Sequence, residues 1–190
     1  MAVDLGGMKV AFLVANEGVE RVELTDPWRA VSESGGQPVL IALEAGEVRT
    51  MDHLDWAERR PVDVVVAEAD PADYDALVLP GGVANPDQLR MDRAAVQFVS
   101  ALFAAGRPAA VICHGPWTLI EAGLVQGRTL TSWPSLRTDI TNAGGTWVDE
   151  SVQVCPAGPN VLVTSRRPDD LPDFNRAMLE AFSSQVARRG

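Results

Sequence analysis

Five short apolar runs constrain the fold of this 190-residue chain more than any other feature. They are rich in Val, Ile and Leu and most do not alternate with polar residues, a pattern typical of strands buried on both faces. The expected strands are Val10–Ala15, Pro38–Leu43, Ala76–Leu79, Ala109–Ile112 and Val161–Thr164. Patterns typical of helices separate them, and this alternation predicts βαβ units with right-handed crossovers. We therefore expect one doubly wound α/β domain over residues 1–190, with a mostly parallel central sheet and helices on both faces.

The expected helices fill the segments between these strands. Gly106 and Gly123 mark the ends of two of them, because Gly commonly terminates a helix. Pro27 is expected in the first turn of the first helix. The expected helices are Asp26–Ser34, Arg93–Ala105, Pro116–Ala122, Arg137–Ala143 and Leu171–Ala187. Residues 146–155 alternate in part and predict an antiparallel excursion from the sheet.

Composition and charge disfavour several classes of partner. The formal net charge of -10 opposes binding to nucleic acid or to an anionic membrane surface, since both require a basic face. No apolar run approaches the roughly 20 residues of a membrane-spanning helix. The first ten residues, MAVDLGGMKV, lack a basic segment followed by an apolar one, so no secretory signal is expected. Two cysteines do not form a disulfide framework, and we expect a cytoplasmic protein with reduced thiols.

Three polar or glycine-rich stretches follow the ends of predicted strands. They are residues 16–23, Pro80-Gly81-Gly82 and Cys113-His114-Gly115. In doubly wound sheets ligands bind beyond the carboxyl ends of the strands, so these stretches are the candidate site.

Cys113 stands where a strand turns sharply into a helix, as the nucleophile does in a nucleophile elbow. A helix N-terminus favours thiolate, so we expect a thiol pKa well below the ordinary value of about 8.5. Backbone N–H groups at such a turn can also form an oxyanion hole. The residues alone leave alternatives open: Cys113 as a small core residue, His114 pointing elsewhere, and Gly81 and Gly82 as turn glycines.

The remaining reactive and aromatic residues carry weaker signals. His53 is expected in a loop, and too few ligands surround it for a metal site, so neither a metal nor a cofactor is expected. Cys155 ends a possible strand and is expected to pack there and not to act as a resolving thiol. Trp117 and Trp133 either line the pocket or pack in the core. Glu23 could simply open a helix, where the dipole favours acidic residues.

Four stretches together resemble the ThiJ/PfpI family over nearly the whole chain. They are ANEGVERVEL, YDALVLPGG, AVICHGPWTLIEAGLVQGRTLTSWPSLRTDITNAGGTWVDE and SRRPDDLPDF. The family includes PfpI-type intracellular proteases and the deglycases associated with Parkinson disease. The resemblance implies a flavodoxin-like fold of the class I glutamine amidotransferase type, and residues 1–190 as a single ThiJ/PfpI-like domain.

The resemblance also implies residue roles. Cys113 matches the nucleophile and His114 its neighbour, while Glu23 matches the glutamate that hydrogen-bonds the cysteine. Partial burial beside a thiolate would raise the pKa of Glu23. The amides of Gly82 and His114 match an oxyanion hole. The third catalytic member, an acid from the neighbouring subunit, falls near Asp87; the loop here is one residue longer and has Asp in place of Glu. This arrangement implies a homo-oligomer, either a dimer or a hexamer built from dimers.

Two functions are weighed for this site. The first is a stress-related cysteine hydrolase in which the thiolate of Cys113 attacks the carbonyl of a peptide or of a small compound. Small substrates would give glyoxalase or deglycase activity on methylglyoxal-type adducts. The alternative is a non-catalytic sensor or protective protein that works through oxidation of Cys113. Glutamine amidotransfer and α/β-hydrolase chemistry fit poorly, because both need a later histidine and none follows His114.

Overall fold

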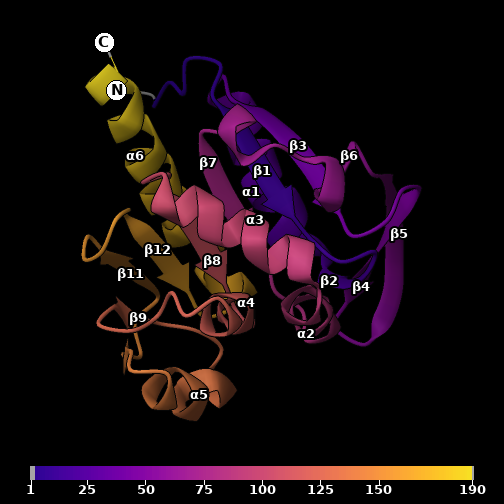
Figure 1. Ribbon diagram of the computed structural model, residues 1–190. Coiled ribbons are helices and arrows are strands. Elements are labelled where there is room, and N and C mark those ends of the chain that lie inside the picture. Colours follow the sequence, from indigo (N-terminus) through magenta and orange to yellow (C-terminus); the bar gives the residue numbers. More distant parts are fainter. Residues whose placement is uncertain (1–2, 190) are drawn as a thin grey trace.

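A seven-stranded sheet forms the centre of the molecule in the computed structural model, which describes residues 3–189, with side chains as far as residue 185. Its strand order is β11-β12-β8-β7-β1-β3-β6 (Figure 1). Every neighbouring pair is parallel except β11 and β12, which are antiparallel. The strands are β1 Lys9–Leu13, β3 Gln37–Ala42, β6 Val64–Val65, β7 Ala76–Leu79, β8 Ala109–Ile112, β11 Val152–Cys155 and β12 Leu162–Ser165. The α/β fold class predicted from the sequence is confirmed.

Two smaller sheets lie beside the central one. The first, in the order β2-β4-β5, contains β2 Glu17–Glu20, β4 Glu47–Asp52 and β5 Asp55–Pro61. The second pairs β9 Thr129–Leu130 with β10 Thr146–Trp147 in parallel. The three-stranded sheet matters for function because the turn between β4 and β5 reaches the carboxyl edge of the central sheet.

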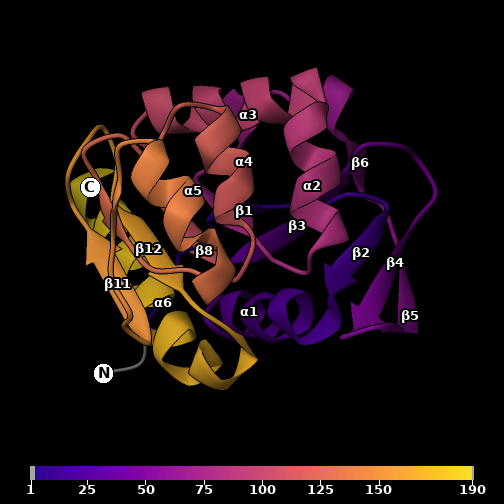
Figure 2. The same cartoon turned by 90° about the horizontal axis from the view of Figure 1, so that it is seen from below.

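Helices cover both faces of the central sheet (Figure 2). On one face lie α1 and α6, which contact each other, and on the other lie α2, α3, α4 and α5. The helices are α1 Arg21–Glu33, α2 Ala84–Met91, α3 Arg93–Ala104, α4 Pro116–Glu121, α5 Arg137–Asn142 and α6 Leu171–Arg189. None of the helices in the described part of the chain is long and apolar enough to cross a membrane.

Two hydrophobic cores explain the unbroken apolar strands. Successive residues of a strand point to opposite faces, so Ala11 and Leu13 of β1 join the core beneath α3. Val10 and Phe12 join the core beneath α1 and α6. All four side chains are fully buried. A sheet buried on both faces favours apolar residues at nearly every position, which is why most of these runs do not alternate.

Most predicted elements lie close to their expected positions. The antiparallel prediction for residues 146–155 is confirmed for β11 and wrong for β10, which pairs in parallel with β9. The prediction was wrong for the start of α1, which begins at Arg21 and not at Asp26. Pro27 lies inside this helix and not in its first turn. The sequence prediction also missed α2, which directly follows the loop that begins at Pro80.

Candidate active site

Cys113 forms a sharp turn between β8 and α4. Its backbone is left-handed, with φ of 62°, a conformation that side-chain-bearing residues adopt at a cost of about 1 kcal/mol. The chain holds it on both sides: its N–H donates to the carbonyl of Ser165 at 3.1 Å, and its carbonyl accepts the N–H of Trp133 at 2.9 Å. The sequence prediction of an elbow at the carboxyl end of a strand is confirmed.

The Cys113 side chain lies on a cavity of about 290 Å³ at this edge of the sheet. Only 6% of the residue is exposed, so the thiol is reached through the cavity and not from the open surface. The lining residues come from several segments: Glu20, Glu23, His53, Leu54, Gly82, Val83, Cys113, His114, Trp133 and Pro168. Within the described residues no group of three His, Cys, Asp or Glu side chains is placed to hold a metal ion.

The imidazole of His114 points toward the thiol, which the sequence alone had left open. Its Nδ1 lies 3.2 Å from Cys113 Sγ, and its Nε2 lies 3.5 Å from Ser135 Oγ. The ring stacks on Trp133, with centroids 5.8 Å apart, and tilts against Trp117 at 5.1 Å. Burial lowers the pKa of His114 to about 4, so the ring is neutral at neutral pH. A neutral imidazole in this position can accept the thiol proton at Nδ1.

Glu23 lies fully buried in the first turn of α1, beside the thiol. Its Oε2 accepts the Gly81 N–H at 2.9 Å, and it is within hydrogen-bonding reach of Cys113. Oε1 has no hydrogen-bond partner in the described part of the chain, which leaves it available to carry a proton. Burial raises the pKa of Glu23 to about 8, in the direction predicted from the sequence.

The protonation of Cys113 differs from the sequence expectation. Burial, together with the negative charge of Glu23, raises the pKa of the thiol, whereas the expectation considered only the helix N-terminus. The backbone amides of Gly82 and His114 act in the opposite direction, because both hydrogen-bond the sulfur. Glu23 and Cys113 therefore do not readily carry a negative charge at the same time. The sulfur ionises more easily when Glu23 is protonated than when Glu23 is charged.

Glycine is required at both positions after Pro80. A Cβ on Gly81 would lie 2.5 Å from Glu23 Oε2 and 2.6 Å from Cys113 Cβ. A Cβ on Gly82 would lie 2.2 Å from the Gly18 carbonyl oxygen, and φ at Gly82 is +80°. All three distances are shorter than van der Waals contact allows. The two glycines therefore let the loop approach the nucleophile closely enough for its amides to reach the sulfur.

Asn85 fixes this loop from inside the protein. Its side-chain amide donates to the carbonyls of Pro80 and Gly81, both at 3.0 Å, and its Oδ1 accepts the Ala15 N–H at 2.7 Å. The residue is completely buried. The sequence did not predict this role, because an Asn shortly after a glycine pair is as typical of an exposed turn as of a buried side chain that holds a loop.

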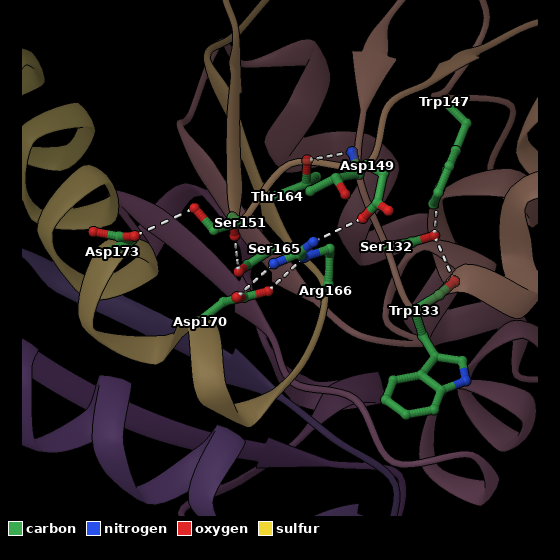
Figure 3. A network of polar contacts seen from close by, with 11 residues as sticks. Ser132, Trp133, Trp147, Asp149, Ser151, Thr164, Ser165, Arg166, Asp170 and Asp173 are labelled. Carbon is green, nitrogen blue, oxygen red and sulfur yellow. Dashed lines mark hydrogen bonds and ion pairs between the residues drawn. The ribbon is translucent and has the colours of Figure 1, made fainter.

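A network of charged groups holds the segment behind the nucleophile (Figure 3). Arg166 donates to both carboxylate oxygens of Asp170, at 2.8 and 3.0 Å, and to Asp149 at 2.7 Å. The neighbouring Ser165 donates its hydroxyl to the Ser151 carbonyl, while its own carbonyl accepts the Cys113 N–H. The network thus fixes the end of β12, whose Ser165 carbonyl holds the Cys113 turn.

A second branch positions Trp133 at the cavity. Trp147 donates its indole N–H to Ser132 Oγ at 3.0 Å, and this hydroxyl donates to the Trp133 carbonyl at 2.9 Å (Figure 3). Trp133 lines the cavity, as one of the two sequence alternatives held. Trp117 lines a separate groove with Arg90 and Asp139 and is absent from this cavity.

Three further cavity residues received no role from the sequence, although one of them, Glu20, lies in the candidate stretch 16–23. Glu20, at the end of β2, is buried at the cavity wall although it belongs to a run that looks like a solvated helix start. His53 was expected in a loop and lies in the β4–β5 turn, with φ of 56°, where it lines the cavity together with Leu54. No local sequence pattern predicts that Glu20 and His53 line the cavity, because the β2-β4-β5 sheet brings them there.

The structure also places Cys155 and Asp87, two residues with predicted roles. Cys155 is buried at the end of β11 within the core beneath α3, which fits packing. Asp87 lies on α2 in an ion pair with Arg90 at 2.9 Å and does not line the cavity of its own chain. An acid contributed by Asp87 would therefore have to come from a second subunit, as the family resemblance implies.

Two substitutions of Glu23 are expected to distinguish the effect of its hydrogen-bond donation on Cys113 from the effect of its side-chain volume. Glu23→Gln retains a donor toward the sulfur and Glu23→Leu does not, so alkylation of Cys113 at pH 7 should slow about tenfold in the Leu variant and far less in the Gln variant. Above pH 8 wild-type Glu23 loses its proton, and its charge then opposes a charge on sulfur. The wild-type rate should therefore rise less steeply between pH 8 and 10 than the rate of the Gln variant.

The measurement is the rate of iodoacetamide modification of Cys113 as a function of pH, followed by peptide mass. Superimposable pH profiles for the three proteins would show that Glu23 and Cys113 are not coupled.

The fold and the site define a class: an α/β protein with a cysteine at the elbow after a central strand, a histidine on the thiol and a carboxyl beside it. The chain belongs to the DJ-1/PfpI family, whose model matches residues 8–181. This confirms the resemblance found in the sequence.

Curated relatives and solved structures agree with this assignment. A Bacillus subtilis protein named "Putative cysteine protease YraA" is 40% identical over 171 residues, covering 90% of this chain and 96% of that protein. General stress protein 18 of Bacillus subtilis is 40% identical over 173 residues, covering 91% and 96%. A two-domain protein of Anabaena variabilis with DJ-1/ThiJ/PfpI-like and ferritin-like domains has a TM-score of 0.83 and 32% identity, over 91% of this chain and 47% of that one. Drosophila melanogaster DJ-1beta shares the fold, with a TM-score of 0.79 at 24% identity over 96% and 95% of the two chains.

Proposed function

We propose that this protein is a Cys113-dependent hydrolase that acts on a small carbonyl compound. The observation that carries the proposal is the 3.2 Å contact between Cys113 Sγ and His114 Nδ1 on the wall of a small cavity. In the proposed step Sγ attacks the carbonyl carbon and forms a C–S bond, while the thiol proton passes to Nδ1. The carbonyl π electrons move to oxygen, where the amides of Gly82 and His114 stabilise the oxyanion.

The size of the cavity favours a small substrate over a peptide. At about 290 Å³ it is at the lower end of the range for small-molecule sites. Glyoxalase or deglycase activity on methylglyoxal-type adducts therefore ranks above peptidase activity in this proposal, although the name of the YraA relative supports cysteine-protease chemistry. We propose a cytoplasmic location, where the thiol stays reduced.

A panel of substrates tests the proposal directly. Turnover of methylglyoxal, release of amine from a methylglyoxal adduct and cleavage of a fluorogenic peptide are measured on the same preparation. We expect turnover of the small carbonyl compounds to exceed that of the peptide. Peptide cleavage alone would move the assignment to peptidase, and no turnover in any arm would contradict the hydrolase.

The name of General stress protein 18 favours a second candidate, a redox sensor. The donors around Cys113 that stabilise an oxyanion would equally stabilise the oxygen of a sulfenic or sulfinic acid. Dilute peroxide should then add oxygen to Cys113 before Cys155, as read by peptide mass. Oxidation at Cys113 without turnover of any carbonyl compound would support the sensor.

Asp87 is expected to act from a neighbouring subunit, so the active form would be at least a dimer. Asp87→Asn and Cys113→Ser chains carrying different affinity tags are co-expressed, and the hybrids are purified through both tags. Each hybrid dimer contains one site with Cys113 and a partner Asp87, so it should recover about half of the wild-type turnover, while each parent variant stays low. Hybrids no more active than the Asp87→Asn parent would refute action in trans, and so would full activity of a dilute monomer in light scattering.

A further inference from the structure

Glu20 supplies a charged wall to the cavity that the chemistry at the sulfur does not use. It is the last residue of β2, is only 8% exposed, and lines the cavity. Its Oε2 accepts the backbone N–H of His53 at 3.1 Å, which pins the β4–β5 turn over the site. In the described chain this is the one hydrogen bond that its carboxylate makes; the adjacent Arg21 forms its ion pair with Asp52 and interacts with Glu20 only through their charges.

The charge of Glu20 acts on the reaction centre. It is one of the causes that raise the pKa of Glu23, the group that hydrogen-bonds Cys113. A charge that is largely removed from solvent is screened less than a surface charge, so its effect extends through the cavity.

Apart from the two backbone amides at the sulfur, the rest of the cavity offers no cationic group to balance an anionic ligand. The rim consists of Leu54, Val83, Trp133 and Pro168, and His114 is neutral at neutral pH. Among the described residues that line the cavity, none is Lys or Arg. A carboxylate or phosphate entering this space would lose hydration, meet the Glu20 carboxylate and find no fixed cation.

We propose that Glu20 is a specificity residue: it excludes anionic electrophiles from Cys113, so that the site takes neutral or cationic small carbonyl compounds. The inference rests on the proposed function for the identity of the substrate. The exclusion itself concerns access to the thiol and can be measured without any turnover.

Two alkylating reagents of nearly equal shape provide the test. Sγ displaces iodide from the CH₂ carbon of iodoacetamide or iodoacetate, forming a C–S bond while the thiol proton passes to the buffer. The quantity is the iodoacetate-to-iodoacetamide rate ratio at Cys113, normalised to that of a neutral free thiol, N-acetylcysteine amide. The reactivity of the thiol cancels in this ratio, so only the charge of the reagent remains.

We expect the wild-type ratio to be about tenfold below that of the free thiol, and Glu20→Gln to raise it about tenfold. Gln retains an oxygen that can accept the His53 N–H, so the turn keeps its anchor while the charge is lost. Glu17→Gln is the matched control: it makes the same charge change three residues earlier on β2, at an exposed position outside the cavity. Its ratio should stay within about twofold of wild type.

Two outcomes would overturn the proposal. One is a wild-type ratio equal to that of the free thiol, a comparison that needs no variant to fold. The other is an equal shift in Glu17→Gln and Glu20→Gln, which would assign the discrimination to net charge. Turnover of neutral phenylglyoxal and of anionic glyoxylate distinguishes the role of Glu20 from the proposed function. Charge-selective alkylation without turnover refutes the hydrolase alone. Turnover without charge selectivity refutes the role of Glu20 alone.

Discussion

Cys113→Ser is expected to lower kcat/KM for every accepted carbonyl substrate by about a thousandfold or more, because loss of a nucleophile removes the covalent step. A serine hydroxyl in this position keeps its proton, because an alcohol is far less acidic than a thiol and the neighbouring imidazole, whose pKa burial lowers to about 4, is a weak base. Ser is nearly isosteric with Cys, so the free energy of unfolding should change by only about 1 kcal/mol. Steady-state kinetics and thermal unfolding of the same sample measure the two effects.

Cys155→Ala is the matched control for this variant. Cys155 is the other free thiol of the chain, buried in a core and outside the cavity. Its replacement should leave turnover and the alkylation of Cys113 near wild type, while iodoacetamide at neutral pH should modify Cys113 much faster than Cys155 in the parent protein. Wild-type turnover in Cys113→Ser, or faster reaction of Cys155, would place the functional centre elsewhere.

The inner strands of the central sheet could be predicted because β1, β7, β8 and β12 are buried on both faces. A strand covered by helices on both faces has few polar positions, so apolar runs such as Ala76–Leu79 and Ala109–Ile112 indicate their own bounds. The small β2-β4-β5 sheet lacks this signal, because β5 is largely exposed and its residues are mostly polar. The prediction failed there for a physical reason: no local pattern distinguishes an exposed strand from a loop.

The same difference explains which site residues could be predicted. Cys113 and the glycines after Pro80 directly follow buried strands, and parallel strands end at one edge, so topology alone brings them together. Glu20 and His53 reach the cavity through the β2-β4-β5 sheet, which was not predicted. The direction of the His114 ring depends on its stacking against Trp133, a contact between segments that sequence spacing does not reveal.

Helix α1 shows the limit of rules based on single residues. Pro is favoured in a first helical turn, so Pro27 indicated a start near Asp26. The helix instead begins at Arg21, and Pro27 lies within it. The early start places Glu23 in the first turn, beside the thiol. A later start would have left Glu23 in an irregular segment with no fixed direction.

Gly82→Ala is expected to cause the largest loss of stability among single-methyl additions near the site. Ala in a left-handed conformation costs about 1 kcal/mol, and here the added Cβ would also lie 2.2 Å from the Gly18 carbonyl oxygen and 2.9 Å from the Glu20 nitrogen. Both obstacles are backbone atoms, so the loop or β2 must move. We expect a loss of roughly 3 kcal/mol in the free energy of unfolding, and a Tm lower by about 10 °C.

Gly123→Ala separates the two causes. Gly123 also has a left-handed backbone, with φ of +69°, but a Cβ there would meet nothing within 4 Å. This control should therefore lose only about 1 kcal/mol, and its turnover should match wild type because it lies outside the cavity. Gly82→Ala, assayed well below its Tm, should in addition lose about a hundredfold in kcat, since moving the Gly82 amide removes one donor from the oxyanion. Equal stability losses in the two variants would mean that the close approach to Gly18 is not what Gly82 is needed for, and full turnover in folded Gly82→Ala would remove its amide from the oxyanion hole.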